Sequence, residues 1–305
     1  MMERVHEGNL VEIFRLTPQL YFRRADLMTR GQCNGAYFFD GENVGVVDVP
    51  TMEGAQEIVD EAKLLFGRPV SSIFITHGHE DHVEGLPFFR DRQVTVFCSE
   101  RLVDRIAKGN GWTIVGVRDR TRVRMAGLEL ECVALDGTAH SPWDMVIRVP
   151  VEKVLITGDT VVDFSILHFH SANVENWIAN LRRLSLTGDQ LVLPGHGEVY
   201  PCSKVAETAD FIETLRRAGE YCLSTLSPEE IAAISEQKIG EIVAACLRVT
   251  SPKPPAFATR PASALSASCA WCSGISCTAS SDKRSSVVRS SVRHRTCAPG
   301  GIVDP

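Results

Sequence analysis

One stretch decides the fold of this chain: Ile75-Thr76-His77-Gly78-His79-Glu80-Asp81-His82, with three histidines and two carboxylates among its last six residues. The apolar run 72–75 is short, β-branched and aromatic, which predicts a buried strand that delivers the histidines into a loop. In such a loop His77 and His79 can face one way while Asp81 and His82 diverge, so that one segment serves two ions. Imidazole and carboxylate suit zinc first, and iron or manganese next. The stretch therefore predicts a metal site.

Length and composition are those of a globular protein. With 305 residues, 44% of them hydrophobic, the chain can bury a full core, and we expect one α/β domain of about 250 residues plus an appendage. The N-terminus shows no apolar signal core, and no later segment approaches the roughly 20 apolar residues of a membrane helix. A cytoplasmic protein without membrane contact is expected. Ten cysteines at irregular spacing indicate reduced thiols and no disulfide framework.

The charge pattern changes at residue 251. The whole chain carries a formal charge of −6, yet residues 251–305 hold seven Lys or Arg against two Asp or Glu, together with twelve serines. This composition predicts a catalytic domain with C-terminal helices over 1–250 and a basic, Ser/Pro-rich, disordered tail over 251–305. Cys269, Cys272 and Cys277 lack a fourth ligand at a convincing spacing for a zinc knuckle, and a nucleic-acid-binding tail is a further alternative.

Strand and helix signals alternate along the body of the chain. Apolar periodicity predicts strands at 10–16, 20–24, 35–39, 44–49, 72–76, 94–98, 128–134, 145–149, 154–157 and 190–194. It predicts helices at 54–66, 100–108, 174–184, 202–223 and 228–248. Two sheets sandwiched between helices would account for this order.

Three more segments place a candidate ligand just beyond an apolar strand. They carry His140 after 133–135, Asp159 after 154–157, and His196 after 191–193. Neighbouring glycines let the backbone turn sharply and approach an ion. Each signal alone is weak, but in this order, after the first motif, the three indicate a single catalytic site.

With these residues in place, the chain resembles the metallo-β-lactamase fold superfamily over about residues 10–225. The resemblance implies an α/β fold, an αββα four-layer sandwich with a two-metal cleft at one edge of the two sheets. It implies that His77, His79 and His140 hold the first ion. Asp81, His82 and His196 would hold the second, and Asp159 would bridge the two. Asp48, after the strand 44–47, would orient a ligand histidine through a hydrogen bond, although a strand-end turn cap also explains it.

Such a site suits hydrolysis. Two divalent ions about 3.5–4 Å apart can share a water, lower its pKa toward roughly 7 and supply hydroxide, while one ion polarises the substrate oxygen. The candidate catalytic residues are Asp81, which can pass a proton from the water to the leaving group, and its neighbour His82. The expected cofactors are two divalent ions, zinc first, with iron or manganese as alternatives.

Departures from the superfamily's branches narrow the function. Asp159 argues against a dedicated β-lactamase, since those enzymes lack a bridging aspartate at this position. His79 stands where flavodiiron proteins need a glutamate, and no inserted domain typical of nucleic-acid-processing branches separates His140 from His196. What remains resembles the glyoxalase II and lactonase branch, which implies cleavage of an ester, thioester or lactone by a metal-bridging hydroxide. A mononuclear iron oxygenase resembling the persulfide dioxygenases, a β-lactamase or phosphodiesterase, and a low-turnover ligand-binding signalling protein stay open.

The substrate signal is thin. The loop 161–170 lacks the tyrosine that acyl-homoserine lactonases of the family use. His168 and His170 could serve as hydrogen-bond donors to the substrate, and Phe164 could line an apolar wall that favours an acyl or aryl group. We expect a small-molecule substrate and neither a nucleic acid nor a membrane. The sequence leaves the substrate, the metal and the oligomeric state open, a homodimer included.

Overall fold

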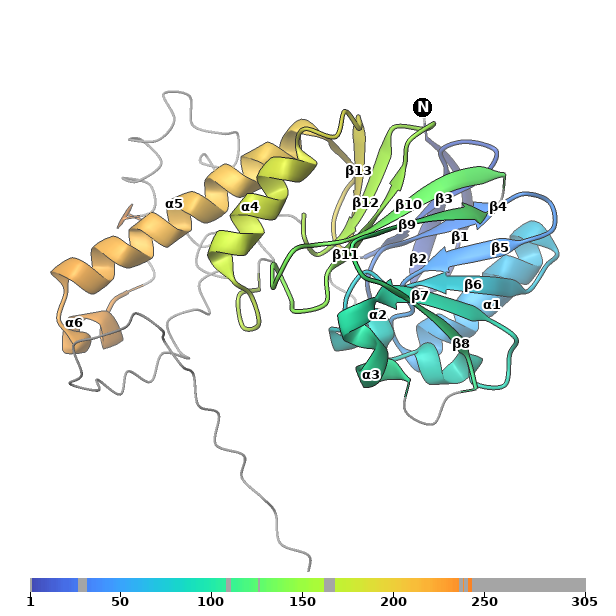
Figure 1. Ribbon diagram of the computed structural model, residues 1–305, viewed down its shortest axis with the longest axis horizontal. Helices are drawn as coiled ribbons and strands as arrows, with labels where there is room; N and C mark the ends of the chain where they lie inside the picture. The colour runs from blue at the N-terminus through green and yellow to red at the C-terminus, as the bar shows by residue number, and fades with distance from the viewer. Residues whose placement is uncertain are drawn as a thin grey trace, which may run out of the picture. The chain divides into compact units, whose positions relative to one another are not determined.

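Two mixed β-sheets form the centre of the computed structural model, which describes residues 2–26, 32–107, 111–125, 127–161, 168–235, 238 and 241–242 (Figure 1). The eight-stranded sheet runs in chain order: β1 (Glu3–Glu7), β2 (Val11–Arg15), β3 (Leu20–Ala25), β4 (Gly35–Phe39), β5 (Val44–Val47), β6 (Val70–Phe74), β7 (Thr95–Ser99) and β8 (Thr113–Val117). The six-stranded sheet runs in the order β14 (Tyr200–Pro201), β13 (Leu191–Pro194), β12 (Val154–Gly158), β11 (Met145–Val149), β10 (Leu128–Ala134) and β9 (Arg120–Met125).

Helices cover the outer faces of both sheets. The longer ones are α1 (Met52–Phe66), α4 (Val174–Leu184) and α5 (Ser203–Thr225); the shorter ones are α2 (Glu80–Val83), α3 (Val103–Ile106), α6 (Pro228–Ala232) and the 3-10 turns η1 (Leu86–Phe89) and η2 (Glu100–Leu102). In Figure 1, α4 and α5 run side by side beyond the six-stranded sheet, and α1 lies against the eight-stranded sheet. The predicted αββα sandwich is confirmed.

Three clusters of buried apolar side chains lie between the four layers of helices and sheets. Between the sheets, Phe38 and Phe74 of the first sheet pack in one cluster with Leu130 and Ile147 of the second. Another cluster lies between the eight-stranded sheet and α1, and the third lies between the six-stranded sheet and α4 and α5. Burial of apolar surface on both faces of each sheet explains why the central strands are continuous hydrophobic runs.

Successive side chains of a central strand enter different layers because they point to opposite faces of the sheet. In β6, Ile73 packs toward α1 and Phe74 packs between the sheets. In β12, Leu155 packs toward α4 and Ile156 packs between the sheets. Each strand thus ties an outer helix layer to the shared centre.

Parallel strand pairs create the edge that carries the site. β5 pairs with β6 in parallel, and β12 pairs with β13 in parallel. The carboxyl ends of such strands open at the same edge of a sheet, where ligands bind in open α/β sheets. At this edge the two sheets are joined directly, since the N–H of Met145 donates to the carbonyl of Thr76 over 2.7 Å and that of Asn34 to the carbonyl of Gly195 over 2.7 Å.

The elements match the sequence-based predictions closely, with several exceptions. The strands expected at 35–39, 128–134 and 145–149 and the helix expected at 174–184 have the predicted bounds. The helix expected at 100–108 is instead η2 followed by α3. Of the helix expected at 228–248 the structure describes α6 and little beyond, and the tail 251–305 lies outside the described residues. Strands β1, β8, β9 and β14 and the short helix α2 were not predicted.

The unpredicted β9 shows why such strands escape pattern analysis. Its sequence alternates arginine with Thr121, Val123 and Met125, and it forms an edge of the six-stranded sheet. Charged side chains on an edge strand discourage pairing with another chain. They also interrupt the run of apolar residues by which a strand is predicted from sequence.

Among the described helices, none is both long and apolar enough to span a membrane.

Candidate metal centre

The ends of four strands bring the predicted ligands to one edge of the sandwich. His77 follows β6, His140 follows β10, Asp159 follows β12 and His196 follows β13. Their side chains, together with those of His79, Asp81 and His82, form two adjoining clusters that share Asp159. The structure therefore brings together all seven residues predicted as ligands.

The first cluster consists of His77, His79, His140 and Asp159, whose ligand atoms all lie within 4.8 Å of one another. Nδ1 of His79 lies 3.0 Å from Nε2 of His77 and 3.1 Å from Nε2 of His140. Oδ2 of Asp159 lies 3.9 Å from Nε2 of His77 and 3.8 Å from that of His140. Four atoms around a tetrahedral zinc, with bonds of about 2.0–2.1 Å, lie roughly 3.3 Å apart. The spacing fits one such ion.

The second cluster consists of Asp81, His82, Asp159 and His196, again within 4.8 Å. Nε2 of His196 lies 3.0 Å from Oδ2 of Asp81 and 3.6 Å from Oδ2 of Asp159. Nε2 of His82 lies 3.3 Å from Oδ1 of Asp159 and 3.7 Å from Oδ2 of Asp81. Two carboxylates and two imidazoles at these distances also suit a single divalent ion.

Two buried atoms of the second cluster lack a hydrogen-bond partner. Nε2 of His82 and Oδ1 of Asp159 face each other and make no hydrogen bond. An unsatisfied buried polar atom costs about 1–3 kcal/mol. A cation between the two atoms would satisfy both, so the residues present fit a metal ion.

Burial keeps the imidazoles of the first cluster neutral. It lowers the pKa of His77 well below the ordinary value, lowers that of His140 to about 3, and lowers that of His79 in the same direction. Neutral imidazole is the form that binds metal. The first cluster is therefore in its ligating state at neutral pH.

The second cluster has the opposite electrostatic character. Burial opposes the change, but the pKa of His82 is raised well above its ordinary value by Cys33 first and then by Asp159 and Asp48, and the pKa of His196 is raised by Asp159 and Asp81. Conversely, the charges of His196 and His82 outweigh burial and lower the pKa of Asp159 well below its ordinary value. The carboxylates of this cluster thus favour a positive charge, which protons or a divalent ion would supply.

Asp48 holds two parts of the site together. Its Oδ1 accepts from the N–H of Thr76 over 2.8 Å, and its Oδ2 accepts from Oγ1 of Thr76 over 2.7 Å and from Nδ1 of His82 over 2.8 Å. The hydrogen bond to a ligand histidine matches the expectation for Asp48. Thr76, which pattern analysis missed, continues the chain of contacts, because its Oγ1 lies 3.1 Å from Nδ1 of His77.

The glycines beside the ligands are required by space. A Cβ on Gly195 would lie 2.2 Å from Oδ1 of Asp159 and 3.0 Å from Cε1 of His82. Gly158 adopts a positive φ of 50°, and a Cβ there would lie 2.4 Å from Oγ1 of Thr76. Only glycine lets the two strand ends approach Asp159 this closely.

The segment after His79 is helical and does not form the predicted loop. His79 is the N-cap of α2, and Asp81 and His82 lie within that helix. Adjacent residues on a helix point about 100° apart, so the turn, rather than a loop, separates these side chains. His82 points inward and is fully buried, whereas the side chain of Asp81 is 32% exposed.

Cys33 is a neighbour of the second cluster that sequence patterns did not reveal. Its Sγ lies within 4.8 Å of a carboxylate oxygen of Asp48 and a ring nitrogen of His82. Burial raises the pKa of the Cys33 thiol to about 11. The thiol is therefore protonated and neutral at physiological pH, and it forms no disulfide.

The predicted substrate contacts are only partly described. Phe164 lies outside the described residues. His168 is exposed, and after burial and the charges of Asp159 and His82 it is a minor cause of the lowered pKa of His79 and His140. His170 is exposed as well, with its ring 6.3 Å from that of His168. Both histidines are thus open to solvent and lie near each other.

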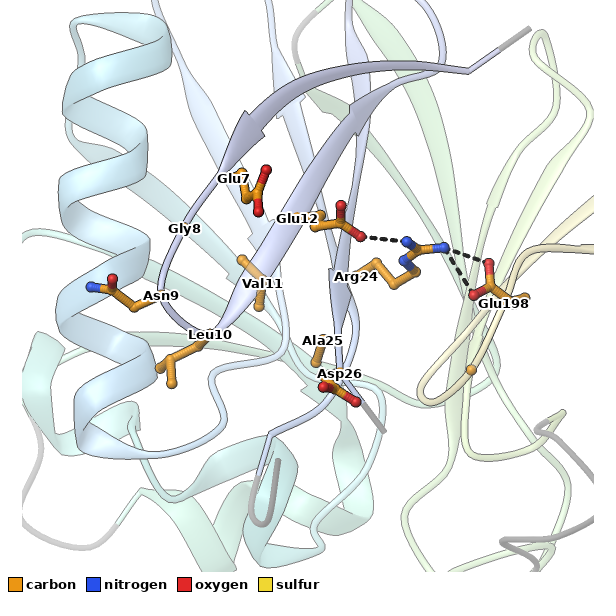
Figure 2. A pocket seen from close by; sticks show the side chains of 11 residues that line it. Glu7, Gly8, Asn9, Leu10, Val11, Glu12, Arg24, Ala25, Asp26 and Glu198 are labelled. Carbon is orange, nitrogen blue, oxygen red and sulfur yellow. Dashed lines mark hydrogen bonds and ion pairs between the residues drawn. The ribbon is translucent and has the colours of Figure 1, made fainter. Parts of the chain in front are cut away.

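A cavity of about 410 Å³ lies apart from the seven ligands (Figure 2). Its lining comes from β1, β2, the end of β3 and the turn after His196, and consists of Glu7, Gly8, Asn9, Leu10, Val11, Glu12, Arg24, Ala25, Asp26, Gly197 and Glu198. Figure 2 shows Arg24 between Glu12 and Glu198, and the Arg24–Glu198 contacts are 2.6 and 2.9 Å long. These charges satisfy one another, so the cavity shows no group that requires a charged ligand.

The sequence has a clear family match. The profile of a family described as "Metallo-beta-lactamase superfamily" matches residues 28–196, which include all seven ligands of the two clusters. The chain belongs to this superfamily. It is accordingly a member of a family of metal-binding hydrolases that share this fold.

Characterised relatives are distant and differ in their reactions. Metallo-beta-lactamase IND-1 of Chryseobacterium indologenes is 26% identical over 59% of this chain and 77% of its own length. Hydroxyacylglutathione hydrolase of Ruegeria pomeroyi is 26% identical over 58% of this chain and 68% of its own length. Atrochrysone carboxyl ACP thioesterase AacuM of Aspergillus aculeatus is 24% identical over 71% of this chain and 68% of its own length.

Solved structures agree on the fold. A metallo-beta-lactamase from Pontibacter korlensis superposes with a TM-score of 0.58 at 20% identity, covering 67% of this chain and 99% of that one. At this identity the similarity concerns the αββα sandwich alone.

Proposed function

We propose that this protein is a two-metal hydrolase that cleaves an ester, thioester or lactone, with a thioester as the first candidate. His77, His79 and His140 would hold one ion, Asp81, His82 and His196 the other, and Asp159 would contact both. The observation that carries the proposal is the pair of four-residue clusters that share Asp159. Without an ion, the buried Nε2 of His82 and the buried Oδ1 of Asp159 have no hydrogen-bond partner.

When bound, the two ions supply hydroxide at neutral pH and polarise the acyl oxygen of the substrate. The chain's own residues prepare this chemistry. The Nδ1–H of His82 donates to Asp48 and that of His77 to Thr76, so both rings present Nε2 to the clusters. The orientation of these ligands is thus fixed before an ion enters.

Asp81 is the residue best placed to move a proton. Its Oδ2 accepts from Nε2 of His196 over 3.0 Å, and with burial opposing, this bond lowers the pKa of the Asp81 carboxyl. Its partly exposed side chain can be reached by water and substrate, whereas the buried His82 cannot. We assign proton transfer to the leaving group to Asp81, and to His82 a role as ligand beside it.

Part of the set of relatives supports a thioester. Three relatives are named for the hydrolysis of an acyl group from glutathione or from an acyl carrier protein, and four are named as metallo-beta-lactamases. Because a thiolate is a good leaving group, cleavage of a thioester needs little acid catalysis by Asp81. We further propose that the substrate is a small-molecule or carrier-bound acyl compound, that no nucleic acid is a partner, and that the protein acts in the cytoplasm.

A substrate panel tests the proposal. Purified protein loaded with zinc, manganese or iron is assayed on thioesters, lactones, aryl esters, phosphodiesters and a cephalosporin, with metal content measured in parallel. We expect two ions per chain and fastest turnover of a thioester. The Asp159→Asn variant should keep the circular dichroism spectrum and lose more than 100-fold in activity. One iron per chain with no hydrolysis would favour the mononuclear oxygenase and overturn the proposal.

A second candidate is β-lactamase activity, favoured by the similarity to IND-1. The aspartate at position 159 weighs against it, because dedicated zinc β-lactamases lack a bridging carboxylate there. The cephalosporin in the same panel decides between the two. Turnover of the cephalosporin that exceeds turnover of every thioester would favour the β-lactamase.

A further inference from the structure

Ser171 contacts two residues of the first cluster from a distant part of the chain. Its Oγ lies 2.9 Å from Nε2 of His79 and 3.4 Å from the backbone carbonyl of His140. The residue lies two positions before Asn173, the N-cap of α4, and 92 positions after His79 in the sequence. No sequence pattern marks it.

The contact bears on which nitrogen of His79 is free to bind an ion. Nδ1 of His79 faces Nε2 of His77 and of His140, whereas Nε2 faces Ser171. A neutral imidazole carries one proton. When that proton is on Nε2, it donates to Oγ of Ser171, and Nδ1 keeps its lone pair for the cluster. The hydroxyl of Ser171 can then donate to the carbonyl of His140, which completes the chain of hydrogen bonds.

Ser171 is held firmly enough to orient its neighbour. The N–H of Asn173 donates to the carbonyl of Ala139 over 2.9 Å, and the N–H of Ala172 donates to the carbonyl of Phe169 over 3.2 Å. The ring of Phe169 packs 5.6 Å from that of Trp177. The short segment around Ser171 is thus attached on both sides to buried structure.

The three histidines of the first cluster differ in how they are supported. His77 is oriented by Thr76 within its own segment. The ring of His140 packs edge-on against Trp177 at 5.1 Å, and its Nδ1 has no hydrogen-bond partner. His79 is half-buried at the start of α2, and within the part of the chain that the structure describes its Nε2 bonds Ser171. It therefore depends most on a residue from elsewhere.

We propose that Ser171 is a positioning residue for the first metal site, which selects the ring tautomer of His79 that presents Nδ1 to the ion. This inference rests on the proposed two-metal function, because the tautomer of His79 matters for function only when Nδ1 binds an ion. It connects the segment before α4, which also carries His168 and His170, to the metal site. Histidine ligands are commonly held in this way, and loss of the partner costs 10–100-fold in metal affinity.

The metal-free protein gives the first test. Ring nitrogen chemical shifts of His79, measured by NMR at pH 7.5 in protein stripped of metal, report which nitrogen carries the proton. We expect the Nε2–H tautomer to predominate in the native protein and in Ser171→Thr, and both tautomers to be populated in Ser171→Ala. An unchanged tautomer in Ser171→Ala would overturn the proposal. This readout stands even if no substrate is ever found.

Zinc affinity gives the second test. Zinc is titrated into each metal-free protein in competition with a chromophoric chelator, with Ser224→Ala as a matched control at an exposed serine. Ser171→Ala should bind the first zinc at least tenfold more weakly, whereas Ser171→Thr and Ser224→Ala should stay within threefold of the native protein. Equal affinity in Ser171→Ala would refute the positioning role. If native protein binds no zinc at all, the proposed function fails, and the tautomer measurement still decides the role of Ser171.

Discussion

His79 is the residue whose removal separates metal binding from folding. It is half-buried at the start of α2, and its Nδ1 is a central atom of the first cluster. We expect His79→Ala to lose one ion per chain and more than 100-fold in hydrolytic activity, because three ligands would remain for that ion. Elemental analysis and the thioester assay measure both losses. The neighbouring exposed Glu80→Ala is the control, and full activity in His79→Ala would defeat the metal mechanism.

Asp48 tests the support beneath the second cluster. Its carboxylate accepts three hydrogen bonds, from Thr76 twice and from His82 once. Asn keeps the shape and tolerates the positive φ of 58° at this position, but its NH₂ group would face a donor. We expect Asp48→Asn to fold normally and to bind the second ion 10–100-fold more weakly. Chelator competition measures the affinity, with the exposed Asp60→Asn as control. Native-like affinity would mean that Asp48 is only a turn cap.

At the residue scale, the metal ligands can be predicted from the sequence more readily than the residues that contact and orient them. The seven ligands stand at strand ends in a recognisable order, so their types and positions could be predicted. Thr76, Cys33 and Ser171 have no such mark, because a serine or threonine becomes a hydrogen-bond partner only when the fold brings it within about 3 Å. Ser171 reaches His79 only after two sheets and the start of α4 are in place.

A substitution at Gly195 tests whether the turn after β13, which carries His196, must approach Asp159 closely. A Cβ there would lie 2.2 Å from Oδ1 of Asp159, so Asp159 would have to move. We expect Gly195→Ala to weaken binding of the second ion at least tenfold and to destabilise the fold by about 1–3 kcal/mol, as overpacking does. Metal titration and urea unfolding measure these effects. Gly111→Ala, which meets only an ordinary contact at 3.7 Å, should change neither; a harmless Gly195→Ala would refute the steric argument.

At the element scale, burial decides what can be predicted. β4, β10, β11 and α4 have strong apolar periods and were predicted with the right bounds. β8 and β9 were missed because residues of both strands remain at least partly exposed, with arginine at alternate positions of β9. The sequence predicts a loop where α2 lies, because four residues are too few to show a helical period. That error matters for the site, since α2 carries Asp81 and His82.

At the scale of the whole molecule, the metal site is a product of the sandwich itself. Residues of the first sheet and of the second both reach the shared edge, and Asp159 belongs to both clusters. Burial of the three imidazoles of His77, His82 and His140 and of the carboxylates of Asp48 and Asp159 is unfavourable without partners. The free energy of unfolding of the metal-free protein should therefore depend on pH, because burial shifts the pKa values of these groups. Among them, His140 has a pKa that burial lowers to about 3.

His140 predicts how stability of the metal-free protein falls with pH. Burial lowers its pKa to about 3 from an ordinary 6.5. Between these values the unfolded chain takes up a proton that the folded chain does not, so this group favours unfolding as the pH falls below 6.5. His82 and His196 have raised pKa values and act in the opposite direction. The contribution of His140 is therefore measured by comparing the pH dependence of the free energy of unfolding in native protein and in a variant without this histidine.

We expect the free energy of unfolding to decrease less steeply from pH 6.5 to 5 in His140→Gln than in native protein, by up to about 1.4 kcal/mol per pH unit. Urea unfolding at several pH values, with chelator present and the exposed His170→Gln as matched control, measures the two slopes. Equal slopes would mean that His140 is protonated in the folded metal-free protein, and that the first cluster is not held in its ligating state.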